Sequence, residues 1–157
     1  MRLRSLLFVP GDSERKLARA TSIPADAIII DLEDSVMPEN KAAARGLAAE
    51  YLAGLPAEQR ARSWVRINPV TSQEAGADLG VVMPHAPAGV MLPKARSPQD
   101  LEVLGRRMGN YEAEYEIPVG STLILPVATE TPEALFSLGE YRGCGPRLAG
   151  LTWGAED

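Results

Sequence analysis

The sequence predicts an α/β fold with a parallel sheet, a (β/α)₈ barrel of the TIM type to which this chain supplies about six strands. Three observations predict it. Short apolar runs alternate with helix-forming stretches along the whole chain. Several runs are continuously apolar, as strands buried on both faces are. Nearly every run ends in polar or charged residues, as the strands of a barrel do at the catalytic edge. We expect residues 1–157 to form a single barrel domain that is truncated at its C-terminal end.

The predicted strands are spaced by roughly two to three dozen residues, which is the size of a βαβ unit. They cover residues 5–10, 26–33, 63–68, 88–94, 121–127 and 148–154. An open, doubly wound sheet is the alternative architecture. That fold usually carries a glycine-rich phosphate turn after its first strand. The first strand here ends in Val9-Pro10-Gly11-Asp12, which is not such a turn.

The segments between the strands predict helices. Residues 39–53 are rich in Ala, Leu, Glu, Lys and Arg, the strong helix formers, and residues 12–20 predict a shorter helix. Ser97 and Thr131 each stand before a proline and an acid, the order of an N-cap and a first helical turn. Residues 69–82 predict a loop with one or two helical turns.

Composition narrows the class of protein. With 157 residues, 45% of them hydrophobic, the chain can bury a core. The net charge of −5, with scattered basic residues, argues against a nucleic-acid partner. The single cysteine, Cys144, excludes an internal disulfide and fits a reducing cytoplasm. The apolar run Leu6–Val9 is too short for a signal peptide, and no run reaches the length of a membrane span. We therefore expect a cytoplasmic protein without a membrane partner.

Charged and polar side chains follow the predicted strands, where a barrel would bring them to one mouth. They are Asp31, Glu33, Asp34, Arg66, Asn68, Lys94, Glu130, Glu156 and Asp157. Carboxylates that face each other repel unless a cation compensates. Mg²⁺ suits such a place because it keeps several waters and takes few protein ligands. Glu130 and Asp157 are the natural pair, since adjacent strands would carry them.

Each acid also has a structural interpretation. Glu130 could accept backbone N–H groups at the start of the helix that follows it, and Asp157 could be an N-cap. The acids within residues 31–34 could cap a helix or pair with Lys41 and Arg45. These alternatives stay open on the sequence alone.

Arg66 and Lys94 are the cations at the predicted strand ends. Arg66 follows Trp64-Val65 in an apolar strand, where an unpaired guanidinium would be costly. It must therefore meet a carboxylate, either from the protein or from a substrate. Lys94 could be a structural ion-pair partner.

Six motifs occur in the order seen in the citrate lyase β-subunit family. They are LLFVPGDSERKLARA, ADAIIIDLEDSV, WVRINP, GVMLPK, ATET and LTWGAED. The chain resembles this family, which includes citryl-, malyl- and citramalyl-CoA lyases, from residue 5 to residue 157. The resemblance implies a (β/α)₈ barrel and a Mg²⁺-dependent carbon–carbon lyase. Such an enzyme cleaves a 3-hydroxyacyl thioester of the citryl- or malyl-CoA type to an oxo-acid such as oxaloacetate and an acetyl thioester.

The resemblance also implies roles for particular residues. Glu130 and Asp157 match the Mg²⁺ ligands of the family, so that Glu130 also lies at the substrate. Arg66 matches the arginine that holds the carboxylate of the oxo-acid. Glu33 and Asp34 look like catalytic residues that orient water and Arg66. Candidates for the phosphates of a CoA or acyl-carrier thioester are Arg15, Lys16, Lys41 and Arg45. Relatives assemble as homotrimers or hexamers, which implies a homo-oligomer.

Two features of the family are absent from this sequence. These are the last two barrel strands and a C-terminal segment that helps to bind the thioester and supplies an acidic proton-transfer residue. Three alternatives therefore stay open: a metal-dependent aldolase acting on free hydroxy-oxo acids, a malyl-CoA thioesterase, or a truncated subunit without catalytic activity.

Overall fold

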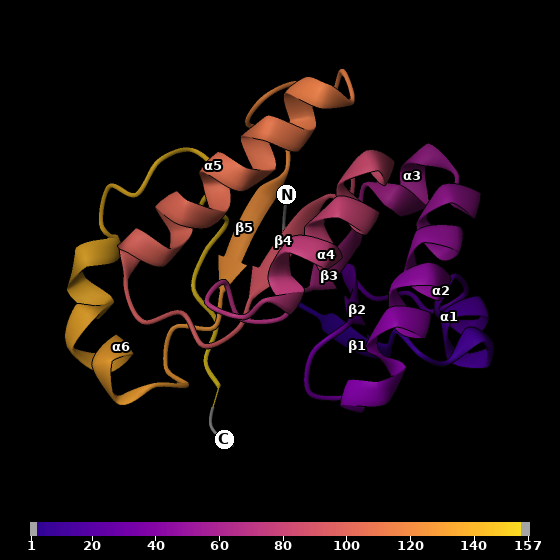
Figure 1. Ribbon diagram of the computed structural model, residues 1–157, viewed down its shortest axis with the longest axis horizontal. Helices are drawn as coiled ribbons and strands as arrows, with labels where there is room; N and C mark the ends of the chain where they lie inside the picture. Colours follow the sequence, from indigo (N-terminus) through magenta and orange to yellow (C-terminus); the bar gives the residue numbers. More distant parts are fainter. Residues whose placement is uncertain (1–2, 155–157) are drawn as a thin grey trace.

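The computed structural model describes residues 3–154 and shows a parallel sheet with helices along one side (Figure 1). Its strands are β1 Leu6–Pro10, β2 Ala27–Asp31, β3 Ser63–Arg66, β4 Gly89–Leu92 and β5 Leu123–Pro126. They pair in chain order, β1-β2-β3-β4-β5, and every pair is parallel. A doubly wound sheet reverses its order at a switch point, whereas a barrel does not. The predicted parallel α/β fold is confirmed, and the described residues do not close the sheet on itself.

The sixth predicted strand, residues 148–154, continues the sheet without forming a regular strand. Two isolated parallel bridges join it to β5, Ile124 to Leu148 and Val127 to Thr152. The Thr152 N–H donates to the Pro126 carbonyl, and the Ala128 N–H donates to the Thr152 carbonyl, both at 3.0 Å. The Thr129 hydroxyl, just beyond β5, also donates to the Gly154 carbonyl and accepts the Gly154 N–H, both at 2.8 Å, so the segment follows β5 without regular strand pairing.

The helices largely follow the expectation. They are α1 Glu14–Ala20, α2 Lys41–Gly54, α3 Ala57–Arg60, α4 Glu74–Val82, α5 Pro98–Glu114 and α6 Pro132–Ser137, with 3₁₀ turns η1 Pro38–Asn40, η2 Met83–His85 and η3 Leu138–Tyr141. Thr131 caps α6 as predicted, because its Oγ1 accepts the Ala134 N–H at 3.2 Å. Ser97 stands at the N-cap of α5 but makes no side-chain cap. The Asp100 N–H donates to the Ser97 backbone carbonyl at 3.1 Å, and the Asp100 carboxylate accepts the Arg96 N–H at 3.0 Å. No helix in the described part of the chain is long and apolar enough to cross a membrane.

Side chains alternate between the two faces of the sheet, and each face has its own core. The larger core lies between the sheet and the helices and includes Ile28, Ile30, Val65, Val90 and Leu92. The smaller core lies on the inner face and consists of Ala27, Ile29, Trp64, Met91, Leu125 and Val127. Burial on both faces explains why the strands read as continuous apolar runs. Gly89 pairs with Trp64 across β3 and β4, and a Cβ there would lie 2.3 Å from the indole ring.

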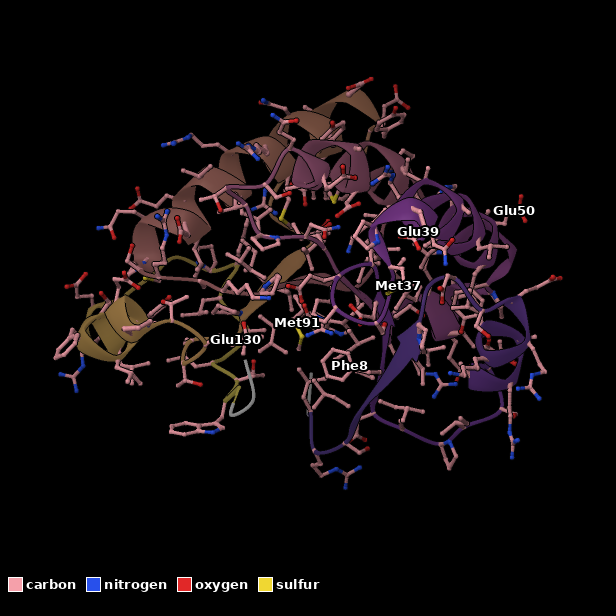
Figure 2. All side chains as sticks on the ribbon, turned by 60° about the horizontal axis from the view of Figure 1, so that its bottom comes forward. Phe8, Met37, Glu39, Glu50, Met91 and Glu130 are labelled. Atoms are coloured by element: carbon pink, nitrogen blue, oxygen red, sulfur yellow. The ribbon has the colours of Figure 1, made fainter. Side chains whose placement is uncertain are left out.

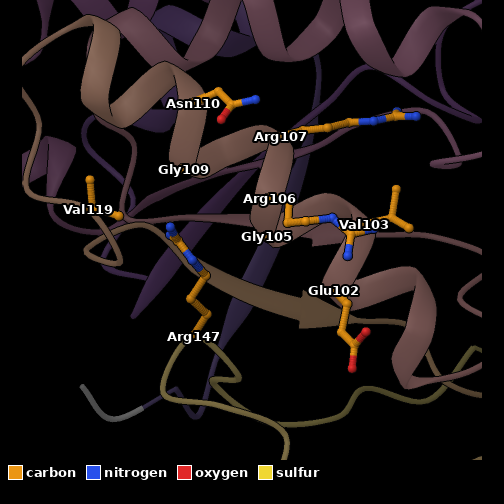
Figure 3. Close-up of a pocket in the computed structure, with 9 residues that line it drawn as sticks. All are labelled: Glu102, Val103, Gly105, Arg106, Arg107, Gly109, Asn110, Val119 and Arg147. Carbon is orange, nitrogen blue, oxygen red and sulfur yellow. The ribbon is translucent and has the colours of Figure 1, made fainter.

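A buried ion pair ties α5 to the segment that precedes residue 148. Arg147 points toward α5 (Figure 3), and its Nη1 and Nη2 lie 2.8 and 2.5 Å from the two carboxylate oxygens of Glu112. Glu112 also accepts the N–H groups of Gly120 and Thr122 at 2.7 and 3.0 Å. Burial alone would raise the pKa of Glu112, but these donors outweigh it and lower the pKa to about 2. The pair therefore fixes the sheet edge beside β5.

Candidate active site

A cavity of about 470 Å³ lies on the inner face of the sheet and reaches the carboxyl ends of the strands. Apolar residues form one wall, and Asp34, Arg66 and Glu130 line it at the strand ends. Figure 2 shows Phe8, Met91 and Glu130 close together at this opening. The sequence-predicted residues Arg66, Asp34 and Glu130 therefore face one space. The cavity joins a hydrophobic surface to charged groups, as sites for small carboxylic acids do.

Arg66 is held by a carboxylate of the protein. Its Nε and Nη2 donate to the two oxygens of Asp31 at 2.8 and 2.7 Å. Its Nη1 lies 3.3 Å from Glu33 and 3.6 Å from Asp34, and its guanidinium carbon stands 4.8 Å from the centre of the Phe8 ring. A bidentate contact of this kind fixes the plane of the guanidinium. Asp31 is thus the partner that the apolar setting of Arg66 required.

Asp31 also shapes the turn that follows β2. It accepts the Glu33 N–H at 2.9 Å, the Ser35 N–H at 3.1 Å and the Ser35 hydroxyl. Burial would raise the pKa of Asp31, but the hydrogen bonds from Arg66 and Ser35 outweigh it and hold the pKa below its usual value. The sequence interpretation placed Asp31 among the residues at the strand ends but gave it no specific role. The signal lies in the strand register, because Asp31 and Arg66 are direct neighbours across β2 and β3.

Glu33 and Asp34 occupy different depths. The Glu33 side chain is only 4% exposed and lies behind the cavity wall, whereas Asp34 is 46% exposed and lines the cavity. Glu33 accepts a 2.7 Å hydrogen bond from the Lys94 ammonium through Oε1, and its buried Oε2 has no hydrogen-bond partner. Burial raises the pKa of Glu33 to about 7, against the opposing effects of Lys94 and Arg66. Asp34 is thus the acid of this pair that faces the cavity.

Glu130 is oriented by the strand next to its own. Its Oε2 accepts the backbone N–H of Lys94 at 2.6 Å. This donor belongs to the segment after β4, whereas the cap of the following helix is provided by Thr131. The Glu130 side chain points into the cavity, where it could serve as a metal ligand.

The charges around this cavity suit a divalent cation. Four acids, Asp31, Glu33, Asp34 and Glu130, meet two cations, Arg66 and Lys94. Carboxylate oxygens are hard ligands of the kind that Mg²⁺ prefers. No cluster of three or more metal-binding side chains occurs within residues 3–154, so Glu130 needs further ligands. Its expected partner Asp157 lies outside the described residues.

Lys41 and Arg45 bind atoms of the protein itself. The Lys41 ammonium donates to the carbonyls of residues 32–33 at 2.9 and 2.8 Å. Arg45 pairs with Glu74 and Asp78 at 2.6 and 3.2 Å. Neither cation pairs with the acidic side chains of residues 31–34, so that alternative is wrong. The other two candidates for phosphate binding are Arg15 and Lys16, which are exposed on α1.

Residues 4–157 match the profile of the family described as HpcH/HpaI aldolase/citrate lyase. The chain belongs to this family. The resemblance inferred from six motifs is thereby confirmed. The chain is 33% identical to the citrate lyase subunit beta of Haemophilus influenzae over 154 residues, which are 98% of this chain and 52% of the relative. It is 30% identical to a (3S)-malyl-CoA thioesterase of Cereibacter sphaeroides, over 98% of this chain and 49% of the relative.

A solved structure of the same family agrees in fold. The protein CitE from Mycobacterium tuberculosis, in complex with magnesium, acetoacetate and coenzyme A, superposes with a TM-score of 0.71 at 30% identity. The match covers 96% of this chain and 48% of that chain. This HpcH/HpaI family chain thus spans about half the length of the curated relatives that it matches.

Gly154 provides the space that Glu130 occupies. A Cβ at Gly154 would lie 2.6 Å from Cγ of Glu130 and 2.8 Å from Cγ1 of Val127. Gly154→Ala is therefore expected to displace the Glu130 carboxylate. If Glu130 is a Mg²⁺ ligand, Mg²⁺ affinity should fall by about tenfold or more, the usual cost of disturbing a group next to a metal. Isothermal titration calorimetry with MgCl₂ measures this. Gly150→Ala is the matched control, because a Cβ there meets Leu125 at an ordinary 3.8 Å. Equal Mg²⁺ affinities of the two variants would contradict the expectation.

Proposed function

We propose that this chain carries the metal and substrate site of a Mg²⁺-dependent carbon–carbon lyase that acts on a 3-hydroxyacyl thioester of the citryl- or malyl-CoA type. The observation that carries the proposal is one cavity lined by Arg66, Asp34 and Glu130. Membership of the HpcH/HpaI aldolase/citrate lyase family supports it. So does the related structure that binds magnesium, acetoacetate and coenzyme A.

In this proposal Glu130 and Asp157 hold Mg²⁺. The bound ion would balance the negative charge of the site and lower the pKa of the substrate hydroxyl. Arg66 holds the carboxylate beside the hydroxyl carbon. Asp31 takes Nε and Nη2, so Nη1, which also lies 3.3 Å from Glu33 and 3.6 Å from Asp34, is the nitrogen that would contact the substrate carboxylate. Because Asp31 already fixes the Arg66 guanidinium, binding the substrate carboxylate would cost little further side-chain entropy.

Asp34 is the acid placed to accept the hydroxyl proton, because it alone of the acids within residues 31–34 lines the cavity. Loss of that proton breaks the adjacent carbon–carbon bond and leaves an oxo-acid and a thioester enolate. Protonation of the enolate gives the acetyl thioester. Arg15 and Lys16 on α1 would contact the phosphates of the carrier, since α1 begins after the carboxyl end of β1.

The second candidate is hydrolysis of malyl-CoA by the same site. A (3S)-malyl-CoA thioesterase is among the relatives at 30% identity, close to the 33% of the citrate lyase subunit. A thioesterase would release malate and CoA, whereas a lyase releases an oxo-acid and acetyl-CoA. The products separate the two activities.

The proposal is tested by incubating the protein with citryl-CoA, malyl-CoA or free citrate, with Mg²⁺ or with EDTA. We expect an oxo-acid and acetyl-CoA from one of the two thioesters, only when Mg²⁺ is present. Release of free CoA without an oxo-acid would establish the thioesterase instead. Cleavage of free citrate alone would establish an aldolase that needs no carrier. Absence of any Mg²⁺-dependent product would overturn the proposal.

Arg66→Lys is expected to lower kcat/KM by about 100-fold, because an ammonium cannot bind Asp31 through two bonds and still reach a substrate. Steady-state kinetics on the cleaved thioester measures the loss. Arg96→Lys is the control, since Arg96 is an exposed arginine just before α5 that pairs with the buried Asp100 and does not line the cavity. Activity of Arg66→Lys close to that of the control would remove Arg66 from the substrate site.

A further inference from the structure

Lys94 has a backbone conformation that its side chain does not favour. It follows β4 with φ at 50°, in the left-handed region. Residues other than glycine rarely adopt this region, and they keep it where the surrounding structure fixes them. A glycine would fit the backbone better, so the lysine side chain needs a separate reason to be there.

Both ends of Lys94 contact acids of the candidate site. Its backbone N–H donates to Oε2 of Glu130 at 2.6 Å. Its ammonium lies 2.7 Å from Oε1 of Glu33 and 3.2 Å from Oδ1 of Asp34. Glu33 and Asp34 follow β2, whereas Glu130 follows β5, so Lys94 connects acids on opposite sides of the mouth. The left-handed turn lets one residue reach both.

The ammonium makes the stronger contact with the more buried acid. Glu33 is 4% exposed and Lys94 is 34% exposed at the side chain, so their bond is largely shielded from water. Charge-assisted hydrogen bonds of this kind are short and roughly twice as strong as neutral ones. Asp34, at the cavity, shares the same ammonium. The Lys94 side chain thus restrains both acids: Asp34, which lines the cavity, and Glu33, which lies behind it.

We propose that Lys94 is a positioning residue of the site: its amide orients Glu130, and its ammonium holds Glu33 and Asp34 against the cavity wall. The inference rests on the proposed lyase function for its effect on turnover. It assigns separate tasks to the main chain and the side chain of one residue. Substitutions that keep the amide and change only the side chain can therefore separate the tasks.

Lys94→Met keeps the length of the side chain and the amide, while Lys94→Gly also suits the left-handed backbone. We expect both to lower kcat alike, by about tenfold to 100-fold, with KM and Mg²⁺ affinity changed less than about threefold. Lys94→Arg should recover part of kcat, because it restores a cation. Thermal unfolding should show Lys94→Gly at least as stable as Lys94→Met. Wild-type kcat in Lys94→Gly, or equal losses in all three variants, would overturn the inference.

A readout without turnover separates this inference from the lyase proposal. The groups that face the Glu33 carboxyl are Lys94, Arg66 and Asp34. NMR titration of ¹³C-labelled glutamate should show the Glu33 pKa higher in Lys94→Met than in wild type, because an ammonium that favours the ionised form is gone. If wild type cleaves no thioester but this shift is present, the lyase proposal fails and the positioning contact stands. If the shift is absent, the inference about Lys94 fails whatever the activity.

Discussion

Glu130→Gln is expected to abolish Mg²⁺-dependent cleavage and leave the fold intact. Glutamine keeps the size of the side chain and still accepts the Lys94 N–H, but it removes the charge that would bind the cation. The loss in kcat/KM should be about 1,000-fold, because a catalytic metal contributes several kcal/mol to transition-state stabilisation. Kinetics across a Mg²⁺ titration, together with thermal unfolding, measures both parts of the prediction.

Glu133→Gln is the matched control for this variant. Glu133 is an exposed acid in the first turn of α6, three residues beyond Glu130. The control should keep both Mg²⁺ affinity and turnover. Unchanged turnover in Glu130→Gln would remove Glu130 from the site. Unfolding of Glu130→Gln at a much lower temperature would instead give Glu130 a structural role.

Arg147→Met is expected to destabilise the fold by roughly 3–5 kcal/mol, because it leaves a fully buried carboxylate without its cation. Glu112 has no exposed side-chain surface, and both of its oxygens are bonded to Arg147. Urea unfolding followed by circular dichroism measures the loss. Arg106→Met is the control, since Arg106 lines the same hollow beside α5 but is exposed (Figure 3). It should change stability by less than about 0.5 kcal/mol.

The same ion pair predicts a dependence on pH. The pKa of Glu112 is lowered to about 2 from 4.5, so the folded state favours the ionised form. The stability that this provides is present above pH 4.5 and is lost as the pH falls toward 2. Arg147→Met should therefore lose less stability than wild type over that range.

A double variant, Arg147→Met with Glu112→Leu, should recover part of the stability that Arg147→Met loses, because no buried charge remains. If acid affects wild type and Arg147→Met equally, the ion pair does not stabilise the fold.

The fold could be predicted in large part because its signals are local. A strand buried on both faces is a continuous apolar run wherever it occurs, so five runs became β1 to β5. The cap at Thr131 is local in the same way. Ser97 failed as a side-chain cap because the Asp100 N–H donates to the Ser97 backbone carbonyl rather than to its hydroxyl, a choice that the pattern does not decide. Residues 148–154 form only two isolated bridges to the strand beside them. An apolar run predicts a buried segment, but its backbone hydrogen bonds depend on the neighbouring strand, which the run does not show.

The sequence predicted which residues gather at the strand ends, but not which of their charges pair. Parallel strands bring their carboxyl ends to one edge, so Arg66 and Glu130 were expected to meet, and they line one cavity. Which charges pair there depends on register and on side-chain reach. Asp31 meets Arg66 across 35 positions, and Lys94 meets Glu33 across 61. Neither separation is visible in a motif. Lys41 and Arg45 were expected to bind phosphate because the sequence does not show their partners. Those partners, such as the Leu32 carbonyl and Asp78, come into contact only when other segments pack against α2.

One metal ion shared by Glu130 and Asp157 is the feature on which the proposed lyase depends most. Crystals grown with Mn²⁺ in place of Mg²⁺ would reveal the ion directly through its anomalous scattering. We expect a single peak with an oxygen of each carboxylate at about 2.1 Å. A peak away from Glu130, or carboxyl groups of Glu130 and Asp157 on opposite faces of the sheet, would contradict it.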